Sequence, residues 1–502
     1  MNSLRNAISN ALDTISTTDI PYTPTPKEIG RVTSVLRGIA VISGLQNVGY
    51  EEVVRFQGGT TGIAFNLEEE SVGVILLDET ARLEAGFDVE RTNKVIDIPV
   101  GNALLSRVID PLARPLDGKG AIQAHHSFPI EQQAPPIIDR LPVSVPLQTG
   151  IKAIDALIPI GHGQRELILG DRQTGKTAIA IDTIVNQKNS DVICIYCSIG
   201  QRCSSVAKVI DDLKEKEAMD HTVVVVAEGE AAAGLRYICP YAATRIAEQF
   251  AAQGKKVLIV YDSLSNHAKA YRELSLLLRR PPGREAYPGD IFYIHARLLE
   301  RATHLSEELG GGSITALPIV ETEGEDISAY IPTNLISITD GQIILSADLF
   351  ERGILPAISI GKSVSRVGGK AQLPAYREIA SHLKLSYAQF EELEAFSRYG
   401  TQLDAKTQAI LEHGKRIRFC LQQKRLDPLA VDVQTFILLA YSEGLLDRII
   451  LDHLDDADVK LREAAHSVPA AISLAIISGQ PLSSEAKETM LKIATTALEG
   501  VQ

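Results

Sequence analysis

Short stretches in which hydrophobic and polar residues alternate dominate the chain from about residue 27 to residue 96. Ile63, Phe65 and Leu67 alternate with smaller or polar neighbours, and the run 72–77 is apolar throughout. Glycine pairs and asparagines separate these stretches, which is typical of short strands joined by tight turns. The pattern predicts a small β-barrel or sandwich for residues 27–96.

A different pattern follows, in which apolar runs alternate with segments of helical periodicity. Four of these runs are rich in β-branched residues and are expected to be strands: 166–169, 192–197, 223–226 and 257–261. Strands that alternate with helices are typical of a parallel sheet whose faces are covered by helices. We therefore predict an α/β domain for residues 97–372.

Helical periodicity returns after residue 372. Leu383, Tyr387, Phe390 and Leu393 recur at intervals of three and four residues, and the segment 386–389 has the residue types of a helix-capping box. The pattern predicts a C-terminal α-helical bundle over residues 373–502.

The first residues form a further short unit. Leu4, Ile8, Leu12 and Ile15 have helical spacing and precede a proline-rich segment that ends at Pro26. A helix tethered by a stiff arm is one interpretation of residues 1–26, and a frayed terminus is the other.

Bulk composition excludes some classes of protein. A net charge of −13 argues against a nucleic-acid-binding protein with a broad basic surface. The sequence has no run of about 18 apolar residues, so we expect no segment that spans a bilayer. The first twenty residues resemble neither a secretory signal nor an organellar transit peptide, and we expect a bacterial or archaeal cytoplasmic protein.

Cysteine usage indicates a reducing compartment. The chain has five cysteines, too few for a disulfide framework in 502 residues. Cys194 and Cys197 have the spacing of a redox or metal pair, but they lie in a predicted buried strand. Residues i and i+3 of a strand face opposite sides, so we expect two structural cysteines here.

An eight-residue segment matches the P-loop pattern G-x-x-x-x-G-K-[ST] at every fixed position. Its residues are Gly170, Asp171, Arg172, Gln173, Thr174, Gly175, Lys176 and Thr177. The glycines let backbone N–H groups surround a phosphate, where the following helix presents its positive end. We expect Lys176 to reach the β- and γ-phosphates of ATP and Thr177 to ligate Mg²⁺, as in a RecA-like nucleotide-binding domain.

A P-loop site also needs an acid at the end of a neighbouring apolar strand. Asp262 follows the predicted strand 257–261 and is the candidate. Such an aspartate holds Mg²⁺ through a water molecule.

From about residue 27 to residue 450 the sequence resembles the α subunit of F-type ATP synthases. Besides the P-loop, four long segments carry the resemblance: 107–118, 148–155, 270–290 and 363–368. The resemblance implies three copies of this chain alternating with three catalytic β subunits around a γ central stalk, with a δ- or b-type peripheral stalk. It also implies a peripheral membrane protein on the cytoplasmic face of a bacterial or archaeal plasma membrane, attached only through the complex.

One position distinguishes α from β subunits. The catalytic β subunits have Gly-Glu-Arg after the strand that follows the P-loop helix, and the glutamate polarises the attacking water. This chain has Gln201 there, as α subunits do. A neutral amide can hydrogen-bond a water but cannot act as its base at neutral pH, so we expect MgATP to be bound and not hydrolysed.

Two residues near position 365 are candidates for action on a neighbouring subunit. An arginine such as Arg366 is on its own more often a surface ion-pair residue. The resemblance implies instead an arginine finger that enters the catalytic site of the adjoining β subunit, with Ser363 shaping the same interface. Such fingers contribute roughly 10³–10⁵ in rate in other P-loop enzymes.

The base-binding half of the site departs from the family pattern. Phe350, which would line the adenine pocket, and Gln423 are retained. Leu355 stands where α subunits have arginine, and Arg425 replaces a second glutamine. The sequence after residue 366 is more similar to that of the divergent alternate F-type ATPases than to that of common α subunits. These ATPases, also called N-ATPases, are thought to pump Na⁺ or H⁺.

Two other classes of motor remain as alternatives. A self-sufficient homohexameric ATPase of the export type would carry glutamate at position 201. A Rho-like RNA helicase also joins a small barrel to a P-loop domain, but the net charge of −13 and the long helical tail count against it.

Overall fold

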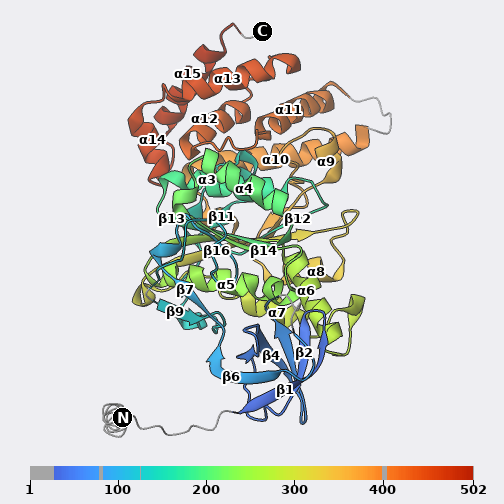
Figure 1. Ribbon diagram of the computed structural model, residues 1–502. Helices are drawn as coiled ribbons and strands as arrows, with labels where there is room; N and C mark the ends of the chain where they lie inside the picture. The colour runs from blue at the N-terminus through green and yellow to red at the C-terminus, as the bar shows by residue number, and fades with distance from the viewer. Residues whose placement is uncertain (1–27, 79–82, 125, 398–403, 501–502) are drawn as a thin grey trace, which may run out of the picture.

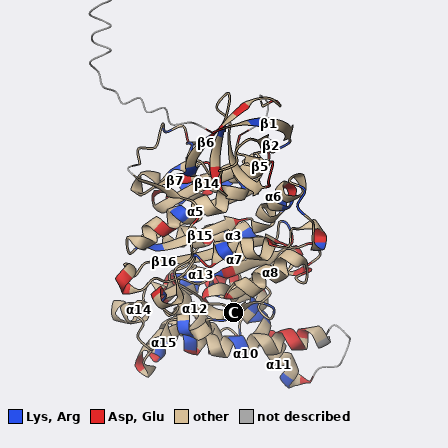
Figure 2. Cartoon of the chain, turned by 90° about the horizontal axis from the view of Figure 1, so that it is seen from below, with Lys and Arg blue, Asp and Glu red and all other residues tan. Residues whose placement is uncertain are grey.

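The computed structural model describes residues 28–78, 83–124, 126–397 and 404–500. A barrel, a sheet layered between helices, and a group of helices follow one another along the long axis of the molecule (Figure 1). The expected N-terminal helix and linker lie outside the described residues. Basic and acidic side chains are intermixed along the ribbon (Figure 2).

Six antiparallel strands close the predicted barrel in the order β1-β2-β5-β4-β3-β6. Their bounds are β1 Ile29–Leu36, β2 Ile39–Ser43, β3 Glu52–Phe56, β4 Thr61–Leu67, β5 Val72–Leu76 and β6 Asp88–Val95. Successive side chains of β4 face opposite sides of the strand. Ala64 packs inside the barrel, whereas Ile63 and Phe65 pack in the core beneath the central sheet. The barrel is therefore fixed to the next domain by the outward face of its own strands.

The central domain contains an eight-stranded sheet in the order β18-β17-β12-β16-β15-β13-β14-β8. Its strands are β8 Val108–Ile109, β12 Glu166–Gly170, β13 Val192–Gln201, β14 Thr222–Glu228, β15 Lys256–Asp262, β16 Ser313–Glu321, β17 Gly341–Ile344 and β18 Val364–Ser365. Every neighbouring pair is parallel except β17 and β18. The predicted parallel sheet is confirmed. The four predicted strands are β12, β13, β14 and β15, and with β16 they form the consecutive series β12-β16-β15-β13-β14.

Helices cover both faces of this sheet (Figure 1). On the side of the C-terminal helices lie α3 Lys176–Asn186 and α4 Cys203–Glu215, and on the barrel side lie α5 Ala233–Ala252, α6 Leu264–Leu277, α7 Ile291–Leu299 and α8 Tyr330–Ile338. The smaller elements of the domain are β7 Asp97–Val100, β9 His126–Pro129, β10 Pro146–Leu147, α2 Lys152–Leu157, β11 Ile160–Gly161 and α9 Ala347–Glu351.

The two cysteines of β13 belong to different hydrophobic cores. Cys194 packs with the core that continues into the C-terminal helices, and Cys197 packs with the core on the barrel side. Both thiols are free, and burial raises the pKa of the Cys194 thiol. The prediction that they do not form a pair is confirmed.

The C-terminal domain is helical, as predicted. Its helices are α10 Pro374–Ser397, α11 Ala405–Leu421, α12 Val431–Ser442, α13 Leu454–Ala465, α14 Ala470–Ile477 and α15 Ser484–Leu498. The capping box predicted at 386–389 is wrong, because α10 runs straight through this segment and starts at Pro374. Proline at the first helical position supplies a preset φ and lacks only an N–H that would be unbonded there. None of the described helices is long and apolar enough to cross a bilayer.

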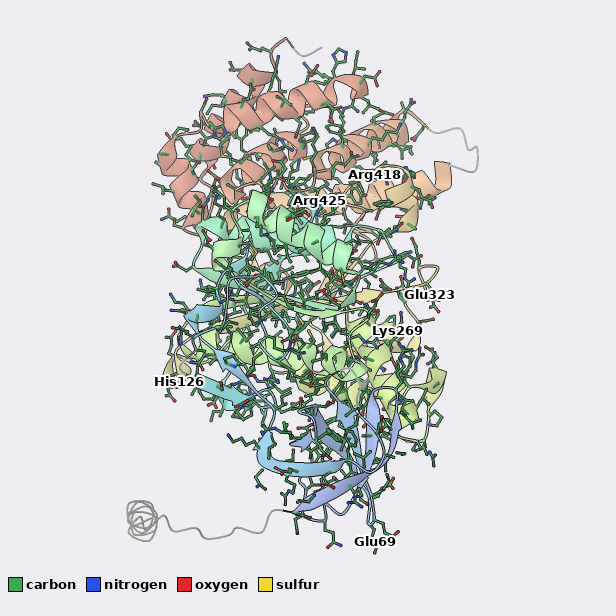
Figure 3. All side chains as sticks on the ribbon, viewed as in Figure 1. Glu69, His126, Lys269, Glu323, Arg418 and Arg425 are labelled. Atoms are coloured by element: carbon green, nitrogen blue, oxygen red, sulfur yellow. The ribbon has the colours of Figure 1, made fainter. Side chains whose placement is uncertain are left out.

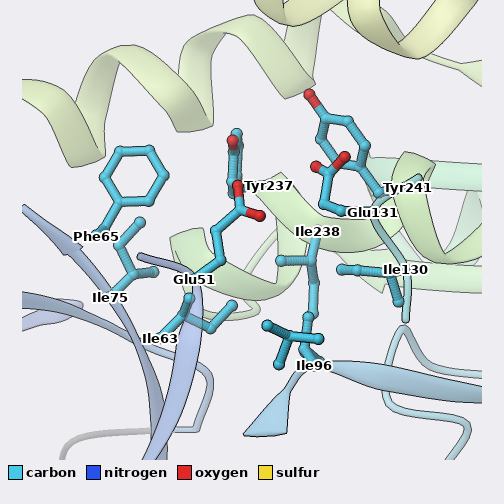
Figure 4. Close-up of a pocket in the computed structure, with 11 residues that line it drawn as sticks. Glu51, Ile63, Phe65, Ile75, Ile96, Ile130, Glu131, Tyr237, Ile238 and Tyr241 are labelled. Carbon is cyan, nitrogen blue, oxygen red and sulfur yellow. The ribbon is translucent and has the colours of Figure 1, made fainter. Parts of the chain in front are cut away.

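A cavity of about 130 Å³ separates the barrel from α5 (Figure 4). Isoleucines, Phe65 and two tyrosines form most of its wall, and the carboxyl groups of Glu51 and Glu131 join them. The Arg297 guanidinium lies 2.8 Å from Glu131 and 3.6 Å from Glu51. Burial outweighs this cation and raises the pKa of Glu131 to about 7.

We expect Glu131→Gln to stabilise the protein more at pH 8 than at pH 5. The neutral Glu131 carboxyl contributes stability that is fully present below its ordinary pKa of 4.5 and is lost as pH rises through about 7. The amide mimics the neutral form at every pH. The free energy of unfolding of the variant, relative to wild type, is therefore expected to rise by about 2–3 kcal/mol between pH 5 and pH 8.

Denaturant titrations at the two pH values measure this difference. Glu69→Gln, at an exposed position on the far tip of the barrel, is the matched control (Figure 3). A pH-independent difference between Glu131→Gln and wild type would contradict the raised pKa.

Candidate nucleotide-binding site

The P-loop joins the carboxyl end of β12 to the start of α3. β12 ends at Gly170, and α3 begins at Lys176. Gly175, immediately before the helix, has a φ of 100°, a left-handed conformation that favours glycine. A Cβ on Gly170 would lie 2.8 Å from Thr174 Oγ1. Both glycines are thus needed for the tight turn that directs the first N–H groups of α3 into the loop.

Lys176 lies across this loop with its ammonium group on the inner side. Its Nζ donates to the Gly170 carbonyl oxygen at 2.8 Å and also to that of Asp171. Burial lowers the pKa of Lys176, although Glu321, Asp262 and Asp171 oppose the shift. A phosphate bound in the loop would accept the hydrogen bonds that Lys176 donates to these carbonyl oxygens, as predicted from the motif.

Asp262 is the centre of the metal half of the site. Its Oδ2 accepts from Thr177 Oγ1 at 2.7 Å and from the Tyr196 hydroxyl at 2.9 Å, and its Oδ1 accepts from Gln201 Nε2 at 2.8 Å. Burial raises the pKa of Asp262, while the bonds from Thr177 and Tyr196 oppose the rise. The structure therefore brings together three residues that the sequence predicted separately: Thr177, Gln201 and Asp262.

The donor set fits Mg²⁺. A hydroxyl and a carboxylate 2.7 Å apart offer oxygen ligands of the kind that this ion prefers. Thr177 would bind the ion directly, and Asp262 would hold it through water. The bound ion would neutralise phosphate charge.

The other P-loop side chains hold the loop or point outward. Asp171 Oδ1 accepts from Thr322 Oγ1 at 2.6 Å and from the Glu325 backbone N–H at 3.0 Å. Burial alone would raise the pKa of Asp171, but these bonds lower it overall. Arg172 is exposed and pairs with Glu321, at the end of β16.

Gln173 and Thr174 complete the loop. Gln173 is exposed with a φ of 65°, and Thr174 is buried with its hydroxyl 2.8 Å from the Asp171 carbonyl oxygen. Thr174 thus closes the turn, and the loop presents backbone rather than these two side chains to a phosphate.

The two predicted base-binding residues, Phe350 and Gln423, differ in their contacts. Phe350, on α9, is 40% exposed and is available to a planar ring. Gln423 uses both amide hydrogens on the carbonyl oxygens of Gly150 and Asp427, and its Oε1 accepts from the Lys152 N–H. Its side chain therefore ties the chain together here, and its contact with a nucleotide stays a prediction.

Arg425, which stands where the family has a second glutamine, is directed elsewhere. Its guanidinium pairs with Asp212 of α4, across the junction between the central and C-terminal domains (Figure 3). The substitution has thus exchanged an amide for an interdomain ion pair.

Arg366 lies at the far end of the sheet from the P-loop. It follows β18, and its guanidinium donates to the carbonyl oxygens of Thr339 and Ile336, both at 3.1 Å, at the end of α8. β18 is aligned with the first residues of β17 and β12, whereas the P-loop follows the last. Four residue steps along β12 separate these ends by about 13 Å. Arg366 is exposed, and its contacts are at the end of α8, not at its own nucleotide site.

Ser363 is 5% exposed and holds the segment that carries Arg366. Its hydroxyl donates to the Ser359 carbonyl oxygen at 2.7 Å and accepts from the Ile344 N–H at 2.9 Å. Ser363 thus fixes the start of β18 to the end of β17. Within the described residues its hydroxyl is occupied by its own chain.

Comparison with known proteins supports the same architecture. Three family models match in order: the "ATP synthase alpha/beta family, beta-barrel domain" at residues 27–93, the "nucleotide-binding domain" of the same family at 150–365, and the "ATP synthase alpha/beta chain, C terminal domain" at 372–497. Among curated proteins, ATP synthase subunit alpha 2 of Albidiferax ferrireducens is 61% identical over 477 residues, which are 95% of this chain and 89% of the relative. This chain belongs to the ATP synthase α subunits.

Two further relatives agree with this assignment. ATP synthase subunit alpha 1 of Marinomonas sp. is 61% identical over 94% of this chain, and subunit alpha 1 of Chlorobium luteolum is 60% identical over 94%; each is itself covered to 93%. The numbered names fit the predicted alternate copy. The resemblance, the three-part fold and the nucleotide-binding domain are confirmed. As an α subunit the chain is part of the ATP synthase complex, peripheral to the membrane.

Sequence patterns missed several residues of the site. Tyr196 lies inside an apolar strand, and Thr322 and Glu325 lie in a polar loop, so none of them has a local signal. The pairing of β16 with β12 brings Thr322 and Glu325 beside the P-loop, and the pairing of β13 with β15 brings Tyr196 beside Asp262.

We expect Gln201→Glu to destabilise the metal-free chain. The change would remove the 2.8 Å donor to the buried Asp262 carboxyl and set a second carboxyl against it, so that one of the two must retain a proton. A loss of about 1–3 kcal/mol follows from the lost bond alone. Gln201→Ala, which removes the bond without adding charge, is the control.

Thermal unfolding with and without Mg²⁺ and ATP distinguishes the two variants. A cation between the carboxyl groups would reduce the penalty of Gln201→Glu but not that of Gln201→Ala. Equal penalties for both variants under both conditions would contradict a direct contact with Asp262.

Proposed function

We propose that this chain is the non-catalytic α-type subunit of a rotary F-type ATP synthase. It binds MgATP without hydrolysing it and supplies Arg366 to the catalytic site of the adjoining β subunit. The observation that carries the proposal is the contact between Gln201 and Asp262. An amide occupies the position from which a general base would act, so the site retains its binding groups and lacks its base.

The position of Arg366 supports the second half of the proposal. The finger lies about 13 Å along the sheet from its own P-loop, on the basis of strand rise, and its contacts are two neutral carbonyl oxygens. A guanidinium held in this way keeps its full charge for the phosphates of a neighbour. Ser363 acts as a positioning residue for this segment.

The rest of the complex follows from family membership. Three copies would alternate with three β subunits around a γ stalk, with a δ- or b-type peripheral stalk on the N-terminal side. The complex would couple ATP synthesis or hydrolysis to H⁺ or Na⁺ transport at the cytoplasmic face of a bacterial or archaeal plasma membrane. The proposed domain limits are 27–96, 97–372 and 373–502.

Steady-state ATPase activity tests the proposal. The purified chain is measured alone, and then mixed with its cognate β and γ subunits. We expect binding of MgATP without turnover by the chain alone, and turnover by the mixture. Robust turnover by the chain alone would contradict the non-catalytic role and favour a self-sufficient hexameric motor, and stimulation by RNA would favour a helicase.

A further inference from the structure

The cavity between the barrel and α5 lies apart from the nucleotide site and has no part in the proposed function. Its volume of about 130 Å³ is close to that of an apolar protein cavity of about 150 Å³ that binds benzene. Val95, in its wall, is 45% exposed, which places one side of the cavity close to solvent. The cavity is therefore large enough for a molecule with one six-membered ring.

One end of the cavity is apolar. Its wall there is made by residues of the barrel, of α5 and of the segments beside β7 and β9, all of them isoleucines: Ile63, Ile75, Ile96, Ile130 and Ile238. Figure 4 shows these side chains on one side of the space and the carboxyl groups of Glu51 and Glu131 on the other. A ring placed against the isoleucines would remove apolar surface from water on both partners.

The opposite end is polar, and its hydrogen-bonding groups are not all used. The Arg297 guanidinium lies 2.8 Å from Glu131 and 3.6 Å from Glu51. Tyr237 lines the cavity and is 5% exposed, and its hydroxyl has no hydrogen-bond partner among the described residues. Leaving a buried hydroxyl without a partner costs free energy, so a ligand atom that bonds to it would be favoured.

The charged groups at this end are paired with one another. They are three carboxyl groups and three guanidinium groups: Glu51, Glu131, Glu248, Arg245, Arg297 and Arg301. Arg301 lies 2.6 Å from Glu248, and Arg245 lies 3.0 Å from the same carboxyl group. Above pH 7, where Glu131 is ionised, these charges balance. A charged ligand would leave one charge unbalanced in a buried place, whereas a neutral ligand would not.

We propose that this cavity binds a small neutral molecule made of one six-membered ring and one hydroxyl group, as in a phenol. The ring lies against the isoleucines and Phe65. The ligand hydroxyl accepts from Tyr237 and donates to the carboxylate of Glu51 or Glu131. Such a molecule contacts the barrel and α5 at the same time, and therefore stabilises the barrel against the central domain. The inference is independent of the function proposed for the nucleotide site.

Calorimetric titration of the full chain at pH 8 tests the proposal, with phenol, toluene and benzylamine as probes. We expect phenol to saturate one site per chain, and benzylamine, which is positively charged at this pH, to bind at least about tenfold more weakly. Tyr237→Phe is expected to lower the ratio of phenol affinity to toluene affinity about tenfold, since it removes one hydrogen bond to the ligand hydroxyl. Tyr293→Phe, at a side chain that is 61% exposed, is the control and should leave the ratio unchanged.

Two further measurements locate the site. Ile96→Phe adds volume inside the cavity and is expected to weaken phenol binding at least about tenfold. Ile137→Phe, at a position that is 87% exposed, is the matched control. Methyl NMR of the wild-type chain needs no variant, and so decides the matter if Ile96→Phe does not fold. Phenol should shift the methyl signals of the five lining isoleucines and leave that of Ile137 unchanged.

Each part of the inference has a result that would overturn it. Phenol that binds Ile96→Phe as tightly as wild type, or that shifts only isoleucines outside the cavity, would rule out the site. An unchanged phenol-to-toluene ratio in Tyr237→Phe would rule out the bond to the hydroxyl. Benzylamine that binds as tightly as phenol would rule out the preference for a neutral ligand. A wild-type chain that shows no saturable binding of phenol would reject the whole proposal.

Discussion

In a complex with the catalytic β subunit, Arg366→Ala is expected to lower the ATPase rate by about 10³- to 10⁵-fold. The transferred phosphoryl group spreads negative charge over its equatorial oxygens, and a guanidinium can span two of them at once. Arg165, which lies beside the first residue of β12, is already paired with Asp340 and Glu300. The nucleotide affinity of the catalytic sites should change far less than kcat, since the effect is concentrated in the transition state.

Matched variants make this result specific. Arg366→Lys keeps the charge but loses the planar fork, so an intermediate rate is expected. Arg448→Ala, at an exposed position of the C-terminal domain, should leave the rate unchanged. Size-exclusion chromatography checks that each complex assembles. An assembled Arg366→Ala complex within about tenfold of wild type would rule out a finger, given the usual contribution of such residues.

The second large effect concerns the chain's own nucleotide. We expect Lys176→Ala to weaken MgATP binding by at least about a hundredfold, equivalent to about 2.7 kcal/mol. Its ammonium lies inside the P-loop, where it donates to the carbonyl oxygens of Gly170 and Asp171. The neutral variant would leave the β- and γ-phosphates to the backbone N–H groups alone.

Thermal shift assays measure this loss directly. A ligand at 100 times its Kd stabilises a protein by about 2.7 kcal/mol, so MgATP should raise the melting temperature of wild type and have little effect on the variant. Lys188→Ala, beyond the end of the same helix and paired with Glu217 on the surface, is the control. Equal shifts for Lys176→Ala and wild type would exclude the P-loop as the binding site.

Local patterns in the sequence predicted the parts of the fold that depend on local physics. The P-loop, the strands on either side of it and the separation of Cys194 from Cys197 each follow from residue spacing within one element. Asp262 was also predictable, since an acid at the end of an apolar strand has a known position relative to a P-loop. The functional type rested on one residue, Gln201, whose meaning came from the family resemblance.

Contacts between distant segments could not be predicted in this way. Tyr196 reaches Asp262 only because β13 and β15 are adjacent, and Glu325 caps Asp171 across the end of β16. Gln423 was expected at a base, yet its amide bonds to backbone groups of Gly150 and Lys152, more than 270 residues away in sequence, and to the nearby Asp427 carbonyl oxygen. The error over the capping box has a similar origin, because tertiary packing of Leu383 and Tyr387 continues the helix through it.

The P-loop follows the last residue of β12, whereas Arg366 lies beside the first residues of that strand, and this has a consequence for symmetry if Arg366 acts as proposed. A contact in which the finger of one subunit enters the site of the next uses two different surfaces, so it is heterologous. A twofold dimer, which joins a surface to itself, cannot form such a contact. Head-to-tail repetition must either close into a ring or continue as a filament. A ring built with the proposed contact would therefore be polar, because the Arg366 surface of every subunit would face the nucleotide site of its neighbour in the same direction around the axis.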